Sequence, residues 1–395
     1  MADDKKPKEQ QGLPEGWKWV RLGEVAKITT GNSNVQDASD DGVYPFFDRS
    51  GEIKRSERYF LDTEAVIVPG EGSDFFPKYF KGKFDLHQRT YAIFNFKGLD
   101  GRFLYYLMHL LRVNLIRIAV GTTVLSLRLP HFQNLEFPLP PIPEQRKIAQ
   151  ILETVDNAIE KTEKIIEKYK RIKQGLMQDL LTKGIDENGN IRSEKTHKFK
   201  DSPLGRIPEE WEVVRLEDLC FLRYGKNLPK EKFKENADYK VYGANGIIGF
   251  YDKYTHEKPT VLVSCRGEYS GVINIAEPYS YITNNSIALT IKDEKTLNTK
   301  FLYYFLKILP REKIVSGSAQ PQVVITDLKN IIVLKPPLPE QQKIAEILSQ
   351  IDQAIEREEK YKEKLERLKK GLMEDLLTGK VRVNKLLEGE NHGMA

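Results

Sequence analysis

The sequence is poor in cysteine: Cys220 and Cys265 are the only two among 395 residues, and both stand in apolar surroundings. Two thiols provide neither a disulfide framework nor a thiolate zinc site, and they suit a reducing cytoplasm. The sequence also lacks any run near the roughly 18 uncharged apolar residues that cross a bilayer, and its charged N-terminus has no apolar segment behind it. We therefore expect a cytoplasmic protein that is neither exported nor inserted into a membrane.

The motifs of self-contained catalysis are missing too. The chain has no Gly-x4-Gly-Lys-Ser/Thr loop, no Gly-x-Gly-x-x-Gly, no Asn-Pro-Pro or Asp-Pro-Pro as in amino-methyltransferases, and no Pro-Asp dipeptide to open a nuclease motif. Its six histidines are scattered without metal-ligand spacing or a nucleophile partner. We therefore expect no catalytic residue, no metal site and no cofactor bound by this chain.

Neither sign of charge is in excess. Lys and Arg total 62 against 57 Asp and Glu, and the net charge of +5 does not by itself indicate nucleic acid as a partner. The balance holds locally, since residues 1–142 carry 19 basic and 18 acidic side chains and residues 208–338 carry 18 and 16.

What the sequence does contain is an internal duplication. Residues 143–182 and 339–378 align without a gap at an offset of 196, with 25 identities in 40 positions. The preceding regions repeat more loosely, through Pro-Glu-x-Trp and Phe-Leu-Tyr-Tyr in each half. Duplication at this spacing predicts two related units. The expected domains are 1–142 and 208–338, followed by long helices over 143–183 and 339–379, with a polar linker over 184–207 and a C-terminal tail over 380–395.

Apolar residues recur in steps of three and four along both long segments, which predicts helices with a coiled-coil seam. Roughly 40 residues give a rod of about 60 Å, which needs a partner helix. If the halves are related by a pseudo-twofold axis, the helices run antiparallel with one domain beyond each end. The alternative is two unrelated surface helices packed on their own domains. The predicted seam consists of Leu152, Val155, Ile159, Leu176, Leu348, Ile351, Ile355 and Leu372.

Each domain combines short β-rich runs with one amphipathic helix, over 102–118 and 300–309. The fold class is therefore α/β (α+β), duplicated, and the aromatic side chains of these helices are expected in the core. Five pairs of polar loops carry residue types that read base edges and bind phosphate, although each alone would be read as an ordinary turn. The candidate DNA-binding residues are Asn32, Ser33, Arg49, Ser50, Ser73, Lys78, His87, Gln88, Arg89, Thr122, Thr123, Arg128, Arg223, Lys226, Asn227, Asn245, Arg266, Tyr269, Asn284, Asn285, Ser318 and Gln320.

On these motifs the chain resembles the specificity subunit of type I restriction-modification systems. The resemblance spans nearly the whole chain and rests on Pro-Glu-x-Trp, Phe-Leu-Tyr-Tyr, the Pro-Glu-Gln helix starts and Gly-Leu-Met-x-Asp-Leu-Leu-Thr at both helix ends. It implies two target-recognition domains, each reading one half of a split, asymmetric site in double-stranded DNA. It also implies assembly with two methyltransferase subunits that bind S-adenosylmethionine, and optionally with two motor-nuclease subunits that use ATP and Mg.

The helix starts and the charged helix surfaces are the expected docking surface for the methyltransferase subunits, although a solvated charged face explains each residue equally well. Because the domains are nearly neutral, we expect the isolated chain to hold DNA weakly. The rival readings are a methyltransferase or nuclease with drifted motifs, a free-standing DNA-binding regulator, and a coiled-coil scaffold. The predicted docking residues are Glu144, Gln145, Lys164, Lys168, Arg171, Glu340, Gln341, Lys360, Lys364 and Arg367.

Overall fold

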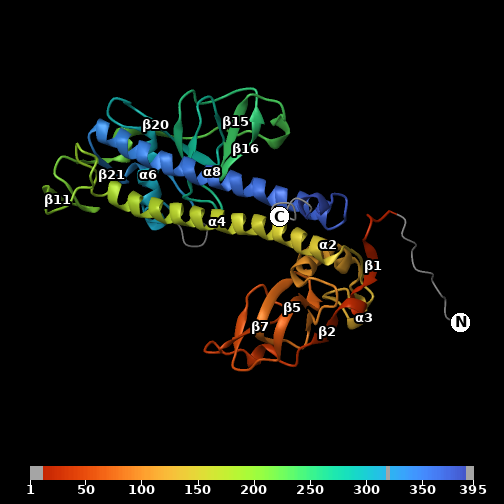
Figure 1. The fold of residues 1–395 in the computed structure, drawn as a ribbon. Coiled ribbons are helices and arrows are strands. Elements are labelled where there is room, and N and C mark those ends of the chain that lie inside the picture. Colours follow the sequence, from red (N-terminus) through yellow and green to blue (C-terminus); the bar gives the residue numbers. More distant parts are fainter. Residues whose placement is uncertain (1–11, 317–320, 388–395) are drawn as a thin grey trace. The chain divides into compact units, whose positions relative to one another are not determined.

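The computed structural model describes residues 12–316 and 321–387, and the chain divides into two compact units (Figure 1). Residues up to 163 together with those from 360 onward form the first unit, and residues 164–359 form the second. Two 39-residue helices, α4 (Ile142–Leu180) and α8 (Leu338–Leu376), each contribute to both units. At about 1.5 Å per residue, each helix is about 58 Å long.

Within each unit, the two long helices run antiparallel. In the first unit, Lys362 pairs with Glu163 at 2.7 Å, and Lys369, further along α8, pairs with Asp156, earlier on α4. In the second unit, Lys170 pairs with Glu359 at 2.8 Å, and the later Lys173 pairs with the earlier Asp352. The partner number falls as the residue number rises, so the start of one helix lies beside the end of the other in both units.

The domain of the first unit is built on a six-stranded sheet in the order β2-β8-β5-β7-β3-β4, with two short pairs, β1-β10 and β6-β9. Its strands are β1 (Lys18–Arg21), β2 (Lys27–Thr30), β3 (Tyr44–Phe47), β4 (Lys54–Ser56), β5 (Leu61–Pro69), β6 (Glu71–Gly72), β7 (Lys78–Leu86), β8 (Thr90–Phe94), β9 (Leu125–Ser126) and β10 (Glu136–Leu139). Its helices are α1 (Leu22–Val25), α2 (Gly101–Ile118), α3 (Leu129–Gln133) and the 3-10 turn η1 (Val35–Asp37).

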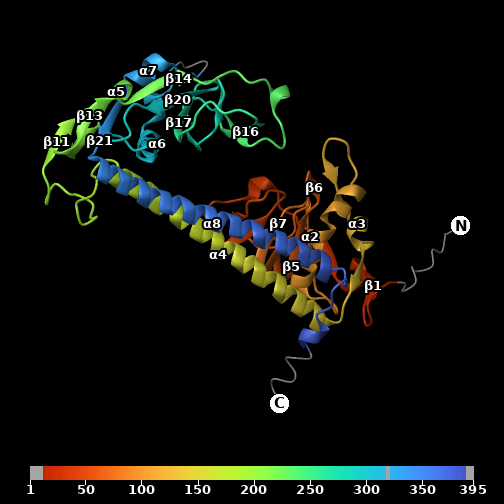
Figure 2. The same cartoon turned by 90° about the horizontal axis from the view of Figure 1, so that it is seen from above.

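The domain of the second unit has a four-stranded sheet, β14-β20-β17-β18, a three-stranded sheet, β16-β15-β19, and the pairs β11-β12 and β13-β21 (Figure 2). Its strands are β11 (Phe199–Ser202), β12 (Gly205–Pro208), β13 (Glu212–Arg215), β14 (Cys220–Tyr224), β15 (Tyr239–Gly243), β16 (Gly246–Tyr251), β17 (Thr260–Ser264), β18 (Ile273–Ala276), β19 (Tyr281–Ile282), β20 (Ser286–Ile291) and β21 (Ile332–Lys335). Its helices are α5 (Leu216–Leu219), α6 (Thr299–Ile308), α7 (Ile325–Lys329) and the 3-10 turns η2 (Lys230–Lys232) and η3 (Arg311–Lys313).

The helices α2 and α6 cover the sheets, as the amphipathic pattern predicts. Each begins at a side-chain cap: Asp100 accepts the backbone N–H of Phe103, and Asn298 accepts that of Phe301, both at 3.0 Å. The two phenylalanines are fully buried. The aromatic faces of these helices therefore belong to the core and do not provide exposed platforms for base stacking.

Each core includes the start of one long helix and the end of the other. Leu152 of α4 and Leu376 of α8 lie in the core of the first domain, and Leu348 of α8 and Leu180 of α4 lie in that of the second. Among the predicted seam residues, Leu152 and Leu348 are fully enclosed, Val155 and Ile355 are buried, and Ile159, Leu176, Ile351 and Leu372 are half-buried. The helix ends are thus domain core as well as seam.

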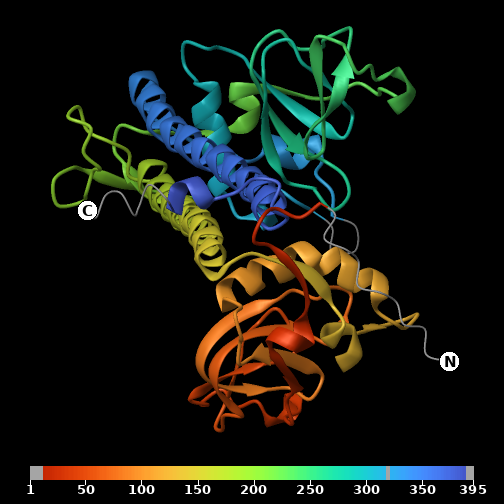
Figure 3. The ribbon, with the colours of Figure 1, turned by 45° about the vertical axis from the view of Figure 1, so that its right-hand side comes forward.

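The segment expected as a plain linker is partly structured. It contains β11, in the yellow-green part of the ribbon (Figure 3). Its apolar residues Ile185 and Ile207 are buried in the core of the second domain. Val383, in the predicted tail, is buried in the core of the first domain in the same way. Polar composition hid these few apolar anchors, because burial of single side chains leaves no periodic pattern. No helix in the described residues is long and apolar enough to cross a membrane.

Candidate nucleic-acid interface

The predicted loops of the first domain come together in space. They leave the ends of different strands, and backbone hydrogen bonds join them one to the next. The bonds run from the N–H of Gly31 to the carbonyl of His87 (3.3 Å), from His87 to Phe47 (2.9 Å), from Gly70 to Arg89 (2.9 Å) and from Leu127 to Gly70 (2.8 Å). Five segments distant in sequence therefore form one surface.

The loops of the second domain follow the same framework. Three of the four bonds have a counterpart 195 or 196 positions further along the chain. These run from the N–H of Thr283 to the carbonyl of Tyr242 (3.0 Å), from Cys265 to Asn285 (3.0 Å) and from Val323 to Cys265 (3.1 Å). The N–H of Gly225, in the place of Gly31, donates instead to the carbonyl of Ser286 (3.0 Å). The duplication thus extends to the loops at the level of the backbone, although their side chains differ.

One glycine in each domain is required by this framework. A Cβ atom on Gly31 would lie 1.7 Å from the carbonyl oxygen of Leu86, and one on Gly225 would lie 2.3 Å from that of Thr283. Both distances are far inside van der Waals contact, so only glycine lets the two loop segments approach so closely.

Most of the predicted DNA-binding side chains are on the surface of these loops. Lys78 and Asn284 are half-buried, and Ser318 and Gln320 lie outside the described residues. The exposed ones are Asn32, Arg49, Ser50, Ser73, Gln88, Arg89, Thr122, Thr123, Arg128, Arg223, Lys226, Asn227, Asn245, Arg266, Tyr269 and Asn285.

Two predicted contact residues, Ser33 and His87, are internal instead. The Ser33 hydroxyl is buried and donates to the Asp85 carboxylate at 2.8 Å. His87 is buried, its Nδ1 accepts the backbone N–H of Arg89 at 3.0 Å, and burial lowers its pKa. Both side chains therefore hold loops in place and do not face a ligand. Lys78 has a related role, because its ammonium donates to the backbone carbonyl of Ser50 at 2.6 Å.

The Pro-Glu-Gln helix starts are also internal, which corrects the prediction that Glu144 and Glu340 contact a partner subunit. Glu144 accepts the Nε of Arg382 at 2.9 Å and the indole N–H of Trp17 at 3.4 Å. Glu340 accepts the indole N–H of Trp211 and the Nη2 of Arg192, both at 3.2 Å. We call each set a Trp–Glu–Arg cluster: Trp17, Glu144 and Arg382 in the first domain, and Trp211, Glu340 and Arg192 in the second.

The neighbouring glutamines are enclosed as well, so Gln145 and Gln341 are not available to a partner either. Gln145 accepts the backbone N–H of Asp100 at 2.7 Å and donates to the carbonyl of Pro140 at 2.8 Å. Gln341 makes the equivalent pair of bonds, with Asn298 at 2.9 Å and Pro336 at 2.7 Å. A buried polar side chain must be hydrogen-bonded, and here those bonds join the long helix to the helix cap of its own domain.

A second matched cluster was missed by the sequence reasoning. The Tyr106 hydroxyl donates to Asp156 at 2.9 Å and Tyr304 donates to Asp352 at 2.7 Å, while Lys369 and Lys173 of the opposite long helix pair with those carboxylates. Burial, followed by the adjacent carboxylate, raises the pKa of both tyrosines. The sequence contains a signal for these Tyr–Asp–Lys clusters, because the Asp and the Lys each occur at the same position in both copies of the duplicated helix.

The remaining predicted docking residues are exposed along the middle of the long helices. Among residues 12–316 and 321–387, no three His, Cys, Asp or Glu side chains are grouped as metal ligands would be. The exposed docking candidates are Lys168, Arg171, Lys364 and Arg367, together with Lys164 and Lys360, which also interact within the chain.

Comparison with known proteins identifies the repeated unit. Residues 14–171 and 208–367 each match the type I restriction modification DNA specificity domain. The MjaVIII specificity subunit of a type I restriction enzyme from Methanocaldococcus jannaschii is 30% identical over 96% of both chains. The EcoDI specificity subunit from Escherichia coli is 28% identical over 86% of this chain and 82% of its own.

Solved structures show the same fold. The S subunit of a type I restriction-modification system from M. genitalium superposes with a TM-score of 0.70 at 20% identity, covering 94% of this chain and 98% of its own. A chain from a structure concerned with complex assembly and conformational transition of the type I system gives 0.51 at 22% identity, with 93% and 99% covered.

Proposed function

The chain belongs to the family of type I restriction-modification specificity subunits, non-catalytic DNA-recognition components with two DNA-recognition domains, and we propose that it reads a bipartite, asymmetric target with one domain on each half-site. The observation that carries this proposal is the repeated loop framework with different side chains. A shared backbone gives both domains the same way to approach duplex DNA, and different side chains give each a different sequence to read.

Specificity subunits assemble with the other subunits of their systems, and we infer that this chain docks two methyltransferase subunits. The docking candidates that remain once the enclosed helix starts are set aside are the exposed basic residues of the long helices, Lys164, Lys168, Arg171, Lys360, Lys364 and Arg367. S-adenosylmethionine and ATP with Mg would be bound by partner subunits, with motor-nuclease subunits optional. The isolated chain would bind DNA weakly, because its two domains are nearly neutral.

The test is methylome sequencing of cells that express this chain with its cognate methyltransferase. The expected result is methylated adenine in one sequence made of two parts with an unread spacer, and no methylation when either protein is expressed alone. Labelled methyl transfer by the pure chain would favour an enzyme with drifted motifs. Failure to co-purify with the methyltransferase would favour a free-standing regulator.

Two sets of variants then assign the half-sites. Replacing Arg89 and Arg128 by Ala is expected to change one half-site only, and replacing Arg223 and Arg266 by Ala the other, because each pair lies on the loops of a single domain. Arg21→Ala is the matched control, since Arg21 is exposed and lies on β1 beside Glu136. Changes in the same half-site from both pairs would contradict the proposal.

A further inference from the structure

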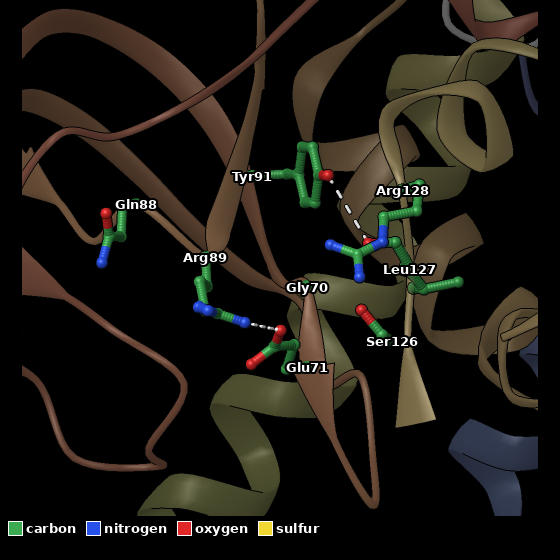
Figure 4. Close-up of a pocket in the computed structure, with 8 residues that line it drawn as sticks. All are labelled: Gly70, Glu71, Gln88, Arg89, Tyr91, Ser126, Leu127 and Arg128. Carbon is green, nitrogen blue, oxygen red and sulfur yellow. Dashed lines mark hydrogen bonds and ion pairs between the residues drawn. The ribbon is translucent and has the colours of Figure 1, made fainter. Parts of the chain in front are cut away.

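A cavity of about 320 Å³ lies among the loops of the first domain, lined by eight residues of three chain segments (Figure 4). The first segment gives residues 70 and 71, the second residues 88, 89 and 91, and the third residues 126–128. The carbonyl of Gly70 accepts the N–H of Leu127, and its own N–H donates to the carbonyl of Arg89. A Cβ atom on Gly70 would lie 2.7 Å from that carbonyl, so these backbones are held at close approach. The cavity wall is therefore fixed before any ligand arrives.

Glu71 forms the polar centre of this wall. Its carboxylate side chain is only 12% exposed, and each of its oxygens bonds a different arginine. Oε2 accepts the Nη1 of Arg49 at 3.1 Å, and Oε1 accepts the Nη1 of Arg89. Both guanidinium groups remain about half exposed, at 45% and 53%. One carboxylate thus orients two arginines and leaves their outer N–H groups free for an acceptor.

Two further donors, the Ser126 hydroxyl and the Arg128 guanidinium, line the cavity. The hydroxyl of Ser126 is buried, with 8% of the residue exposed, and no hydrogen-bond partner exists for it within the described structure. The guanidinium of Arg128 is turned toward the same space in Figure 4. A buried hydroxyl without a protein partner is uncommon, and this one has its hydrogen-bonding capacity available to a group that enters the cavity.

The chemistry of this set fits a guanine edge. Guanine presents two adjacent acceptors in the major groove, N7 and O6, which an oriented guanidinium binds through two parallel N–H groups. A phosphate would bring a negative charge beside the Glu71 carboxylate, whereas the neutral base edge avoids that repulsion.

On the premise of the proposed function, we propose that the cavity reads a guanine in the half-site of the first domain, with Arg89 as the reading residue and Glu71 as a positioning residue. Arg128 and the Ser126 hydroxyl bind the same nucleotide from the opposite wall.

The experiment uses the complex of this chain with its methyltransferase and measures binding to its bipartite target. Each guanine of the first half-site is replaced in turn by adenine or by 7-deazaguanine, which lacks the N7 acceptor. We expect one position at which the wild-type complex loses about 5- to 150-fold in affinity, the range of one bidentate contact. At that position, R89Q abolishes the discrimination and E71Q reduces it, while recognition of the second half-site is unchanged.

The matched control is E136Q, which removes the carboxylate from another surface arginine pair of the same domain and should leave the discrimination intact. Arg89 is half exposed, so R89Q keeps the test decisive if E71Q fails to fold. If R89Q weakens binding equally for all sequences and reduces the salt dependence, Arg89 contacts a phosphate and the inference is overturned. The inference is also overturned if R89Q changes the discrimination at no guanine of the first half-site. Loss of the bipartite target in the wild-type complex would instead overturn the proposed function itself.

Discussion

The two DNA-recognition domains share a loop framework but place opposite charges at its centre. In the first domain, the position after the Gly70 bond is Glu71, and in the second the equivalent position is Arg266. The arginines at 49 and 89 correspond to Ala244 and Asn285. The charge is thus reversed within one backbone framework, so the same loop geometry accommodates side chains of opposite sign.

Behind the loops, the comparison gives the opposite result. The Trp–Glu–Arg and Tyr–Asp–Lys clusters consist of the same residue types in both domains, and these residues pair with one another in the same way. Each arginine lies beyond the end of the opposite long helix, and each lysine lies in the last turns of that helix. Both clusters therefore join residues that are far apart in the sequence. The common framework is therefore held by buried polar contacts.

Glu340→Ala is expected to have the largest effect on stability. Arg192 and Glu340 are 10% and 8% exposed, so the substitution leaves a buried guanidinium without its counter-ion and lowers the free energy of unfolding by about 3–5 kcal/mol. Glu144→Ala should cost less, because Arg382 is 25% exposed and water can solvate it. Urea denaturation followed by circular dichroism measures both.

Glu212→Ala is the control for this comparison, since Glu212 is 64% exposed where it pairs with Lys335 in the second domain. A surface pair of this kind contributes about 1 kcal/mol or less. Equal losses from Glu144→Ala and Glu340→Ala, or a loss from Glu340→Ala no larger than that of the control, would show that burial does not distinguish the two clusters.

The Tyr–Asp–Lys clusters are expected to respond equally in the two domains. Tyr106→Phe and Tyr304→Phe each remove one hydrogen bond to a carboxylate, which should cost about 1.5–3 kcal/mol of unfolding free energy. Tyr303→Phe is the control, because the Tyr303 hydroxyl accepts only the exposed ammonium of Lys307. A clear difference between the two buried positions in the same denaturation assay would mean that the framework is less alike than its bonds suggest.

Much of this framework could be predicted from the sequence. The offset of 196, the heptad-like spacing and the amphipathic Phe-Leu-Tyr-Tyr helices predicted the duplication, both long helices and the core role of Phe103 and Phe301. The family resemblance is confirmed. These features are periodic or local, so each leaves a pattern that can be read along the chain.

The roles of Glu144 and Ser33 could not be predicted in that way. A Glu at a helix start is usually solvated, and nothing in the local sequence shows that Arg382, more than two hundred residues later, will bury it. Likewise, the sequence places Ser33 on a polar loop, and only the fold shows that its hydroxyl is buried and bonded to Asp85. Partners set by tertiary structure are invisible to residue type and spacing.

Acid should destabilise the first domain through protonation of His109. The second domain has Lys307 at the equivalent position. Burial, with smaller effects of Lys369 and Arg112, lowers the pKa of His109 to about 4. An unfolded histidine has a pKa of about 6.5, so between these values the unfolded state binds more protons. The free energy of unfolding therefore falls as the pH is lowered from about 6.5 to about 4, by about 1–2 kcal/mol at pH 5.

His109→Phe keeps the ring contacts with Tyr105 and removes the titrating group. Denaturation at pH 7 and pH 5 should show a smaller loss of stability on acidification in this variant than in the wild type. His197→Phe, in the other unit, serves as the control and should retain the wild-type difference. An unchanged pH dependence in His109→Phe would remove this distinction between the domains.

The smallest effect is expected on the exposed side of the paired long helices. Lys170 and Glu359 are 57% and 47% exposed, and solvent screening limits such a pair to about 1 kcal/mol or less. Lys173, one turn further along α4, is 18% exposed, pairs with Asp352 and lies 5.7 Å from the centre of the Tyr304 ring, so Lys173→Ala should cost more than Lys170→Ala. If thermal melts of the two variants show equal losses, the enclosed cluster contributes no more to the helix register in the second unit than a surface pair does. The larger effect of Lys173 instead places that role on the same residues that repeat in the first unit as Lys369, Asp156 and Tyr106.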